Sequence, residues 1–443
     1  MDNRLTSGSV FRNILRFSLP YLLSYLLQTL YGLADLFIIG LFDGVAGTTA
    51  VSVGSQVMHM LTVMIVGLAM GTTVSIGQAV GKRDERSAER CIGNSVTLFL
   101  ALSVVLTVLL ELLVQPIVSV ISTPKEAAAG TAAYLVICFA GIPFITAYNI
   151  ISSIFRGLGD SRHPMYFIAV ACAVNIGLDF FFMGAMKLGP AGAALGTILA
   201  QAVSVLTALF FVRRYHLVAL HKEDLRPNAS VMGRIVQIGL PIALQDGLIQ
   251  VAFILITVIA NRRGLVDSAA VGIVEKIISF LFLVPSSMLS TVSALGAQSI
   301  GAGQRDRARR TLLYAILIAA GFGAVVSLVM QFTASSAVGL FTSDAAVAKA
   351  GGEYLRGYIF DCIFAGIHFS FSGYFCAVGR SGLSFLHNII AIALVRVPGV
   401  YLTSLLFPET LLPMGLATAA GSLVSVLICC IAFQWLTRRE QES

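Results

Sequence analysis

Long apolar segments alternate with short polar ones along almost the whole chain. Twelve of these segments are long enough to cross the roughly 30 Å hydrocarbon core of a bilayer as a helix. Because no water is available there to bind exposed backbone groups, such segments must be helical. We therefore expect an all-α polytopic membrane protein whose twelve transmembrane helices cover approximately residues 17–40, 51–80, 92–115, 131–155, 164–184, 190–212, 235–260, 269–297, 311–332, 353–377, 384–406 and 412–436.

The composition supports this prediction and excludes several classes of protein. The chain is 57% hydrophobic and only 12% charged, whereas soluble domains carry about 25% charged residues. The net charge of +7 reflects basic loops and does not indicate a nucleic-acid partner. The sequence contains no P-loop, no HExxH and no CxxC motif. We expect neither an enzyme nor a transporter that hydrolyses ATP.

The distribution of basic residues predicts the orientation of the helices. If the N-terminus lies in the cytoplasm, 21 of the 29 Lys and Arg residues fall in inside segments and 5 fall in outside loops. Only the pair Arg262-Arg263 fits this arrangement poorly, because it places two adjacent arginines in an outside loop. Because basic residues accumulate in cytoplasmic loops, we expect both termini to be cytoplasmic.

The two halves of the chain resemble each other. At an offset of 220 residues, Gln78 and Gly81 match Gln298 and Gly301, and at an offset of 221 the pair Leu19-Pro20 matches Leu240-Pro241. An even number of helices per half makes the halves parallel repeats, as in many secondary transporters. We predict an N-terminal lobe over 1–213, a cytoplasmic inter-lobe loop over 214–234 and a C-terminal lobe over 235–443.

Two acidic residues lie inside the apolar segments of the first half. Asp179 follows Asn175 by four residues, so both face the same side of the fifth helix, and Asp35 lies in the first helix. A carboxylate at this depth costs roughly 2.5–3.5 kcal/mol and usually has a function. No Lys or Arg lies in the first six apolar segments, which leaves a proton, a metal ion or an organic cation as the counter-charge. A purely structural polar pair is the alternative.

Other residues are candidates for a substrate cavity or for helix kinks. Asp246 and Asp361 are either cavity acids or structural partners of Arg396. Apolar and aromatic side chains suit flat drugs, and we assign to the cavity Tyr31, Phe37, Met64, Phe280 and Met288. Proline interrupts helices, so kinks are expected at Pro20, Pro143, Pro285 and Pro398.

Five motifs in order resemble the MATE (multidrug and toxic compound extrusion) family over nearly the whole chain. They are Ala34-Asp35 with Phe37-Ile38-Ile39-Gly40, then Gly77-Gln78-Ala79-Val80-Gly81, Phe155-Arg156-Gly157-Leu158-Gly159-Asp160-Ser161, Val174-Asn175 with Asp179, and Gly189-Pro190-Ala191-Gly192-Ala193-Ala194. The resemblance implies a V-shaped pair of six-helix lobes that alternate access and export organic cations against an inward flow of Na⁺ or H⁺.

Prokaryotic members of that family place a cation site in the N-terminal lobe, and the resemblance assigns it here to Asp35, Asn175, Asp179 and Thr197. Asp246 and Asp361 do not match the spacing of the second-lobe acids in NorM-type members. A DinF-like type with the ion in the first lobe therefore fits better.

The expected protein is a monomeric antiporter of the bacterial inner membrane that handles small cationic or amphipathic molecules amid membrane lipid. It needs no cofactor besides the coupling ion, Na⁺ or H⁺. The alternative is a flippase for lipid-linked or other amphipathic metabolites from the same superfamily. Such a flippase would favour a more basic cavity than the few Lys and Arg within the apolar segments provide.

Overall fold

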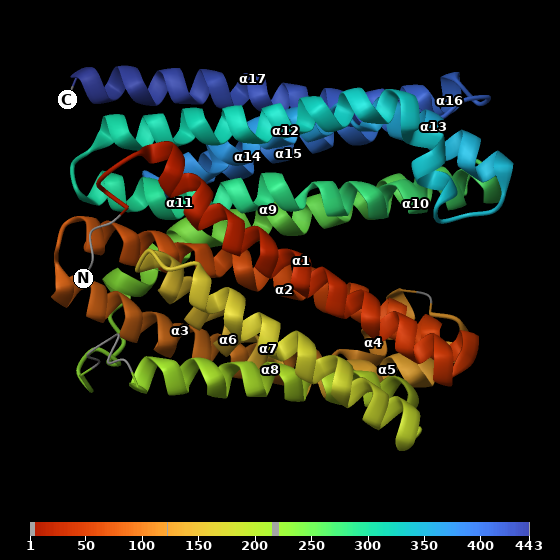
Figure 1. The fold of residues 1–443 in the computed structure, drawn as a ribbon, viewed down its shortest axis with the longest axis horizontal. Coiled ribbons are helices and arrows are strands. Elements are labelled where there is room, and N and C mark those ends of the chain that lie inside the picture. Colours follow the sequence, from red (N-terminus) through yellow and green to blue (C-terminus); the bar gives the residue numbers. More distant parts are fainter. Residues whose placement is uncertain (1–4, 122, 215–220, 443) are drawn as a thin grey trace. The chain divides into compact units, whose positions relative to one another are not determined.

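The computed structural model describes residues 5–121, 123–214 and 221–442, and these residues form helices and connecting turns without any strand. They group into two compact units (Figure 1). Leu19–Gly239 make up the first unit, and the second begins at Leu240 and also takes in the N-terminal residues up to Ser18. The helix that crosses this boundary near the N-terminus was expected to lie wholly in the first lobe.

The first unit contains most of the first helix and the seven that follow it, with one π-helical segment. The elements are α1 (Val10–Phe42), α2 (Gly44–Gly81), α3 (Glu85–Leu112), α4 (Val114–Val120), α5 (Lys125–Ala140), α6 (Ile142–Gly157), α7 (Arg162–Asp179), η1 (Phe180–Ala185) and α8 (Gly189–Arg214).

The second unit repeats this plan, again with one π-helical segment near its end. Its elements are α9 (Ala229–Asn261), whose first turns belong to the first unit, α10 (Leu265–Leu281), α11 (Leu283–Gly301), α12 (Arg305–Gly339), α13 (Ala345–Tyr358), α14 (Asp361–Ala377), α15 (Gly382–Ala391), η2 (Ile392–Arg396), α16 (Val397–Leu406) and α17 (Leu412–Glu442).

The number of membrane-spanning helices agrees with the prediction. Among the described residues, 10 helices are long and apolar enough to cross a membrane, and two bent pairs raise the number to 12. The pairs are α5 with α6, bent by 50°, and α13 with α14, bent by 41°. They correspond to the fourth helix of each half, so the repeat includes the bend as well as the sequence.

Prolines explain some of these interruptions but not all of them. Pro143 lies at the start of α6 and Pro285 near the start of α11, each directly after a break, and Pro398 follows η2. A proline is tolerated in the first turn because its missing N–H is not needed there. Pro20 lies inside the continuous helix α1. The break between α13 and α14 contains no proline.

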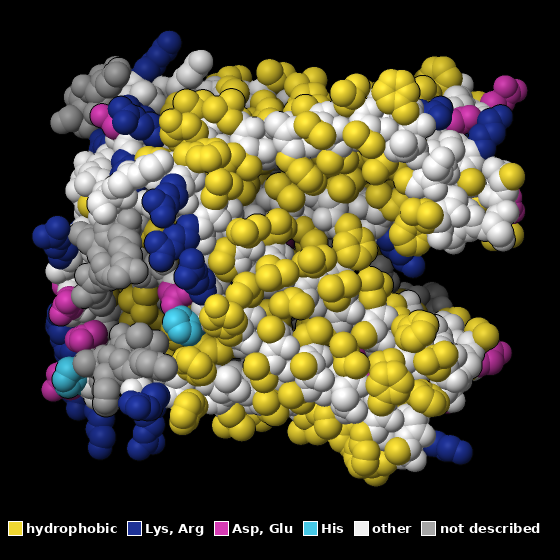
Figure 2. Space-filling model, in the orientation of Figure 1, with side chains coloured by type: hydrophobic (Ala, Val, Ile, Leu, Met, Phe, Trp, Pro, Cys, Tyr) yellow, Lys and Arg dark blue, Asp and Glu magenta, His cyan; other side chains and the backbone are white. Residues whose placement is uncertain are grey.

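The outward faces of the helices suit a lipid environment. On α3, Leu100, Val104 and Val108 follow one another at four-residue spacing and are 61%, 54% and 57% exposed. Figure 2 shows hydrophobic side chains along the middle of the helices and Lys and Arg gathered mainly where α3 begins and α17 ends. A long exposed apolar stripe of this kind is unfavourable in water, so the protein is a multi-pass membrane protein.

The N-terminal residues are fixed to the second unit by packing and by one arginine. Val10, Ile14 and Phe17 are buried in the same cluster as Met288. Arg307 at the start of α12 donates to the backbone carbonyls of its N-terminal neighbours, including those of Leu5 and Gly8 at 3.1 and 2.9 Å. These contacts explain why the first turns of α1 cluster with the second unit.

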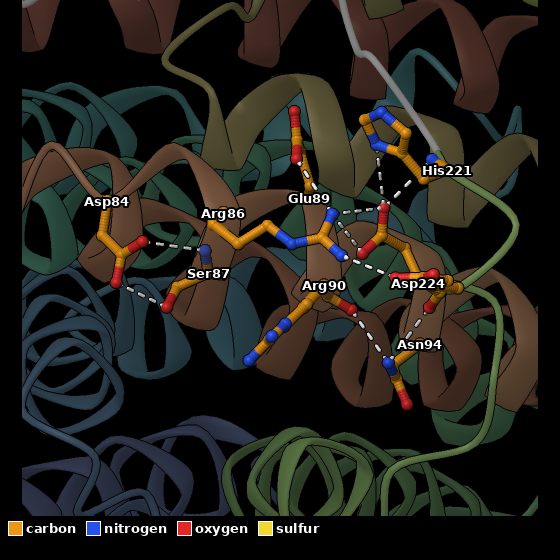
Figure 3. Close-up of polar contacts among 9 residues, drawn as sticks. Asp84, Arg86, Ser87, Glu89, Arg90, Asn94, His221 and Asp224 are labelled. Carbon is orange, nitrogen blue, oxygen red and sulfur yellow. Dashed lines mark hydrogen bonds and ion pairs between the residues drawn. The ribbon is translucent and has the colours of Figure 1, made fainter.

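The end of the inter-lobe loop is fastened to α3 within the first unit (Figure 3). The side chain of Asp224 is fully buried, and its Oδ1 lies 2.9 Å from Nη1 of Arg86. Asn94 donates to the Asp224 carbonyl at 3.2 Å and accepts from the backbone N–H of Asn228 at 2.7 Å. The loop is therefore an ordered part of this unit from His221 onward.

This cluster is an ion-pair network rather than a metal site. Glu89, His221 and Asp224 offer ligand atoms within 4.8 Å of one another, but the Arg86 guanidinium already bridges both acids, 3.4 Å from Glu89. Burial alone would raise the pKa of Asp224, yet the His221 amide and Arg86 hold that pKa below its ordinary value. The resulting stabilisation is present at neutral pH and is lost as the pH falls through the lowered pKa.

Replacing Asp224 by Ala is expected to release the loop without unfolding the helices. The variant removes the nearest acid from Arg86 and the acceptor from the backbone N–H of His221, so local opening becomes easier. Trypsin should cut after Lys222 roughly tenfold faster in detergent solution. Asp306→Ala is the control, because it removes the same charge from a side chain that is 89% exposed at the start of α12, outside the loop. Equal cleavage of both variants would show that Asp224 does not hold the loop.

Candidate functional site

Three helices of the first unit bring the predicted cation-site residues together. Asp35 comes from the last third of α1, Asn175 and Asp179 from the last turns of α7, and Thr197 from α8. The helical spacing of Asn175 and Asp179 places both on the side of α7 that is buried. Asp179 is 0%, Asn175 1% and Asp35 4% exposed.

The four side chains form a continuous polar cluster. Thr197 donates from its hydroxyl to Oδ2 of Asp35 at 3.1 Å, and Asn175 donates from Nδ2 to Oδ1 of Asp179 at 3.5 Å. The carboxyl groups of Asp35 and Asp179 lie within hydrogen-bonding reach of each other. Helices α1, α7 and α8 thus meet at one pair of acids.

Three oxygen atoms of this cluster form no hydrogen bond, and no basic side chain among the described residues pairs with its acids. Oδ1 of Asp35, Oδ2 of Asp179 and Oδ1 of Asn175 are buried without a hydrogen-bond partner. None of the ion pairs formed by the described residues involves either carboxylate. Buried polar atoms rarely lack a partner, and two close carboxylates repel each other unless a cation or a proton lies between them. Oxygen donors of this kind fit Na⁺ as well as H⁺.

The backbone around Asp179 is adapted to this arrangement. Asp179 is the last residue of α7 before the π-helical segment η1, and π-helical insertions occur frequently at functional sites. On α8, a side chain at Gly196 would overlap Oδ1 of Asp179. Glycine at this position therefore leaves the space that the carboxylate occupies.

The second unit places its acids differently. Asp361 is fully buried and forms an ion pair with Arg396, which is the last residue of η2. Asp361 is thus the partner of Arg396, one of the two alternatives raised by the sequence. Asp246 is half-buried and takes part in none of the ion pairs of the described residues. Glu275 accepts a hydrogen bond from the Thr257 hydroxyl at 3.1 Å.

The residues assigned to a substrate cavity differ widely in exposure. Phe37 is 66% exposed, and Met64 and Phe280 are half-buried. Met288 is 3% exposed and packs in the core of the second unit. Tyr31 accepts from Nε2 of Gln201 at 3.5 Å, one turn from the acid pair. Gln201 was not predicted, although its position four residues after Thr197 is a signal for it.

Comparisons with known proteins identify the family. The MatE family model matches residues 20–181 and again 241–402. The probable multidrug resistance protein YpnP of Bacillus subtilis (strain 168) is 27% identical over 89% of this chain and 88% of its own length. The multidrug export protein MepA of Staphylococcus aureus (strain N315) is 24% identical over 90% and 89%.

Solved structures of MATE transporters share the fold. An outward-facing multidrug resistance MATE transporter superposes with a TM-score of 0.92 at 22% identity, over 99% of this chain and 98% of that one. A MOP superfamily transporter from Pyrococcus furiosus, for which reversed polarity of the binding pocket suggests a different function, gives 0.89 over 99% and 97%. Because the family model covers most of both halves, the chain belongs to the MatE family of multi-pass membrane transporters.

Proposed function

We propose that the protein exports organic cations, drugs among them, in exchange for Na⁺ or H⁺ bound at Asp35, Asn175 and Asp179. The relatives named as multidrug resistance and export proteins support the choice of substrate class. The observation that carries the ion site is the buried contact between two carboxyl groups with no basic partner among the described residues. Thr197 supplies a hydroxyl to the same site.

The lack of an equivalent site in the second half supports coupling in the first. The family model aligns the halves at an offset of 221 residues, which puts Ile256 opposite Asp35 and Val400 opposite Asp179. Both are buried in one apolar core cluster. At an offset of 220, Leu255 and Gly399 take these places, so neither offset puts an acid opposite Asp35 or Asp179.

The exchange follows from the competition of two cations for the same negative charge. Na⁺ or H⁺ taken up from outside neutralises the acid pair and weakens the attraction for a cationic drug. After the ion leaves to the cytoplasm, the ionised pair favours binding of the next drug molecule. A ligand can shift the conformational equilibrium only by its different affinity for the two states, and the charge of the acid pair provides that difference.

The cellular setting is part of the proposal. The bias of Lys and Arg toward alternate loops supports cytoplasmic termini, and the bacterial export proteins among the relatives support the plasma membrane as the location. We propose a monomer as the transporting unit.

Replacing Gly196 by Ala is expected to slow transport while sparing the fold. The new methyl group would overlap Oδ1 of Asp179, so the carboxylate must turn away from Asp35. We expect transport to fall roughly tenfold, which corresponds to about 1.4 kcal/mol. Gly177→Ala is the matched control, because a side chain there meets no atom within 4 Å. Dye efflux at full rate in Gly196→Ala would contradict this geometry.

Proteoliposomes with imposed gradients test the function directly. A Na⁺ gradient and a pH gradient are applied separately, and transport of a cationic dye is followed for the wild type and Asp179→Asn. Transport driven by one gradient and lost in the variant supports the proposal and names the ion. If a folded, inserted wild type moves no cationic dye under either gradient, the proposal is refuted, and lipid-linked or anionic cargo would be tested next.

A further inference from the structure

Polar side chains continue from the acid pair along one side of α1. Tyr21, Tyr25, Gln28, Tyr31 and Asp35 follow one another at intervals of three or four residues. They therefore share one face of the helix. The opposite side of the same stretch is apolar and open, with Leu23, Leu30 and Leu33 41%, 45% and 43% exposed. This polar face leads from Asp35 back toward the first turns of α1.

Helices α8 and α6 provide the facing side chains. Gln201 on α8 donates to the Tyr31 hydroxyl at 3.5 Å, one turn below the contact between Thr197 and Asp35. Farther along, the Tyr148 hydroxyl of α6 donates to the Pro164 carbonyl at 3.4 Å and interacts with the side chains of Gln28 and Ser152. We call the set of Tyr21, Tyr25, Gln28, Tyr31, Tyr148, Ser152 and Gln201 the polar line.

Arg156 lies at the far end of the polar line, in the last turn of α6. Its Nη1 donates to the Tyr21 hydroxyl at 3.0 Å, and its Cζ lies 4.5 Å from the centroid of the Tyr21 ring. Tyr21 in turn donates to the Tyr25 hydroxyl at 3.0 Å. The Arg156 residue is 7% exposed, so a cation–π contact and a hydroxyl hold a nearly buried guanidinium.

The charge of Arg156 is not neutralised by a neighbouring acid. None of the ion pairs among the described residues includes it, and its Nε is buried without a hydrogen-bond partner. A guanidinium does not lose its proton in proteins. A positive charge therefore lies permanently at the end of the polar line.

The polar line offers hydrogen-bonding groups between the acid pair and Arg156. Hydroxyl and amide groups can both donate and accept hydrogen bonds, and Oε1 of Gln201 and Oγ of Ser152 are buried without a partner. Such a line, if open at its far end, would let the coupling ion leave the acid pair without any drug being moved. Exchange requires that this leak be blocked.

We propose that Arg156 is an electrostatic plug that prevents Na⁺ or H⁺ from leaking between the acid pair and the cytoplasm along the polar line. The inference rests on the proposed function, which makes the acid pair the ion site and puts the end of α6 on the cytoplasmic side. A fixed guanidinium at the end of a line of polar groups repels metal ions and protons alike. Tyr21 is the positioning residue that holds the plug in place.

The test uses full-length protein in liposomes without drug, with the internal pH followed by a trapped dye and Na⁺ uptake followed in parallel. In Arg156→Gln, either the pH gradient or the Na⁺ gradient is expected to decay about tenfold faster than in the wild type. A tenfold change corresponds to about 1.4 kcal/mol of lost repulsion. Arg156→Lys keeps the positive charge, so both gradients should decay as slowly as in the wild type. Arg162→Gln is the matched control, because Arg162 is exposed at the start of α7 in the same turn region.

The leak must depend on the acid pair if it follows the polar line. The double variant Arg156→Gln, Asp179→Asn is therefore expected to hold both gradients as long as the wild type does. If Arg156→Gln fails to fold, Tyr21→Leu, which removes the ring and hydroxyl that hold the guanidinium, should give a smaller leak of the same kind. No leak in a folded variant, or a leak that survives Asp179→Asn, overturns the inference. If the wild type shows no gradient-driven export, the proposed function is refuted instead.

Discussion

Asp179→Asn and Asp35→Asn are each expected to abolish drug export, reducing it to the level of membranes without the protein. An amide keeps the shape of the carboxyl group but carries no negative charge and takes up no proton, so neither Na⁺ nor H⁺ can exchange with a cationic drug. Because both carboxyl groups are buried and lie within hydrogen-bonding reach of each other, we expect that one cannot replace the other. Dye efflux from cells, compared at equal amounts of inserted protein, measures the effect.

The control for these variants is Asp306→Asn, an equal change of charge at a side chain that is 89% exposed at the start of α12. It should export at the wild-type rate. Normal efflux by both Asp179→Asn and Asp35→Asn would remove the acid pair from the mechanism.

Arg396→Met is expected to cause the largest loss of stability among single changes in the second unit. The substitution leaves the fully buried Asp361 carboxylate without its ion-pair partner, and breaking a buried pair in this way costs about 3–5 kcal/mol. Thermal unfolding of the purified protein in detergent measures the change as a lower melting temperature.

The double variant Arg396→Met, Asp361→Leu should recover most of that stability, since replacing both charges by apolar groups of similar size is often neutral. A single variant as stable as the wild type would show that the ion pair contributes nothing. A double variant no better than the single one would show that η2 depends on the arginine for another reason.

Much of the architecture was predictable because membrane helices have a simple sequence signal. Apolar length, basic loops and the offset of about 220 residues predicted the number of helices and the two halves, and the structure and family match confirm both. Pro143 and Pro285 marked two of the breaks correctly. The break between α13 and α14 contains no proline, so its bend depends on packing that the sequence does not display.

Part of the candidate site was predictable because a charge in an apolar segment is rare enough to stand out. The four-residue spacing of Asn175 and Asp179 placed both side chains on one face of their helix. Two acids in apolar segments without a basic partner indicated that Asp35 and Asp179 share one cation site, and the family resemblance assigned the same residues. Gln201 and Arg156 were missed as parts of one polar line because Gln and terminal Arg residues are common, and only the packing of α1, α6 and α8 brings them together.

The most direct measurement of the central claim is the release of the coupling ion when a drug binds. A cationic dye is added to purified, weakly buffered protein in detergent, and released protons and Na⁺ are both recorded. If drug and ion compete through the acid pair, each must lower the affinity for the other. We expect ion release that saturates with dye binding in the wild type and is absent in Asp179→Asn. Dye binding with no release of either ion, or equal release by the variant, would contradict the claim.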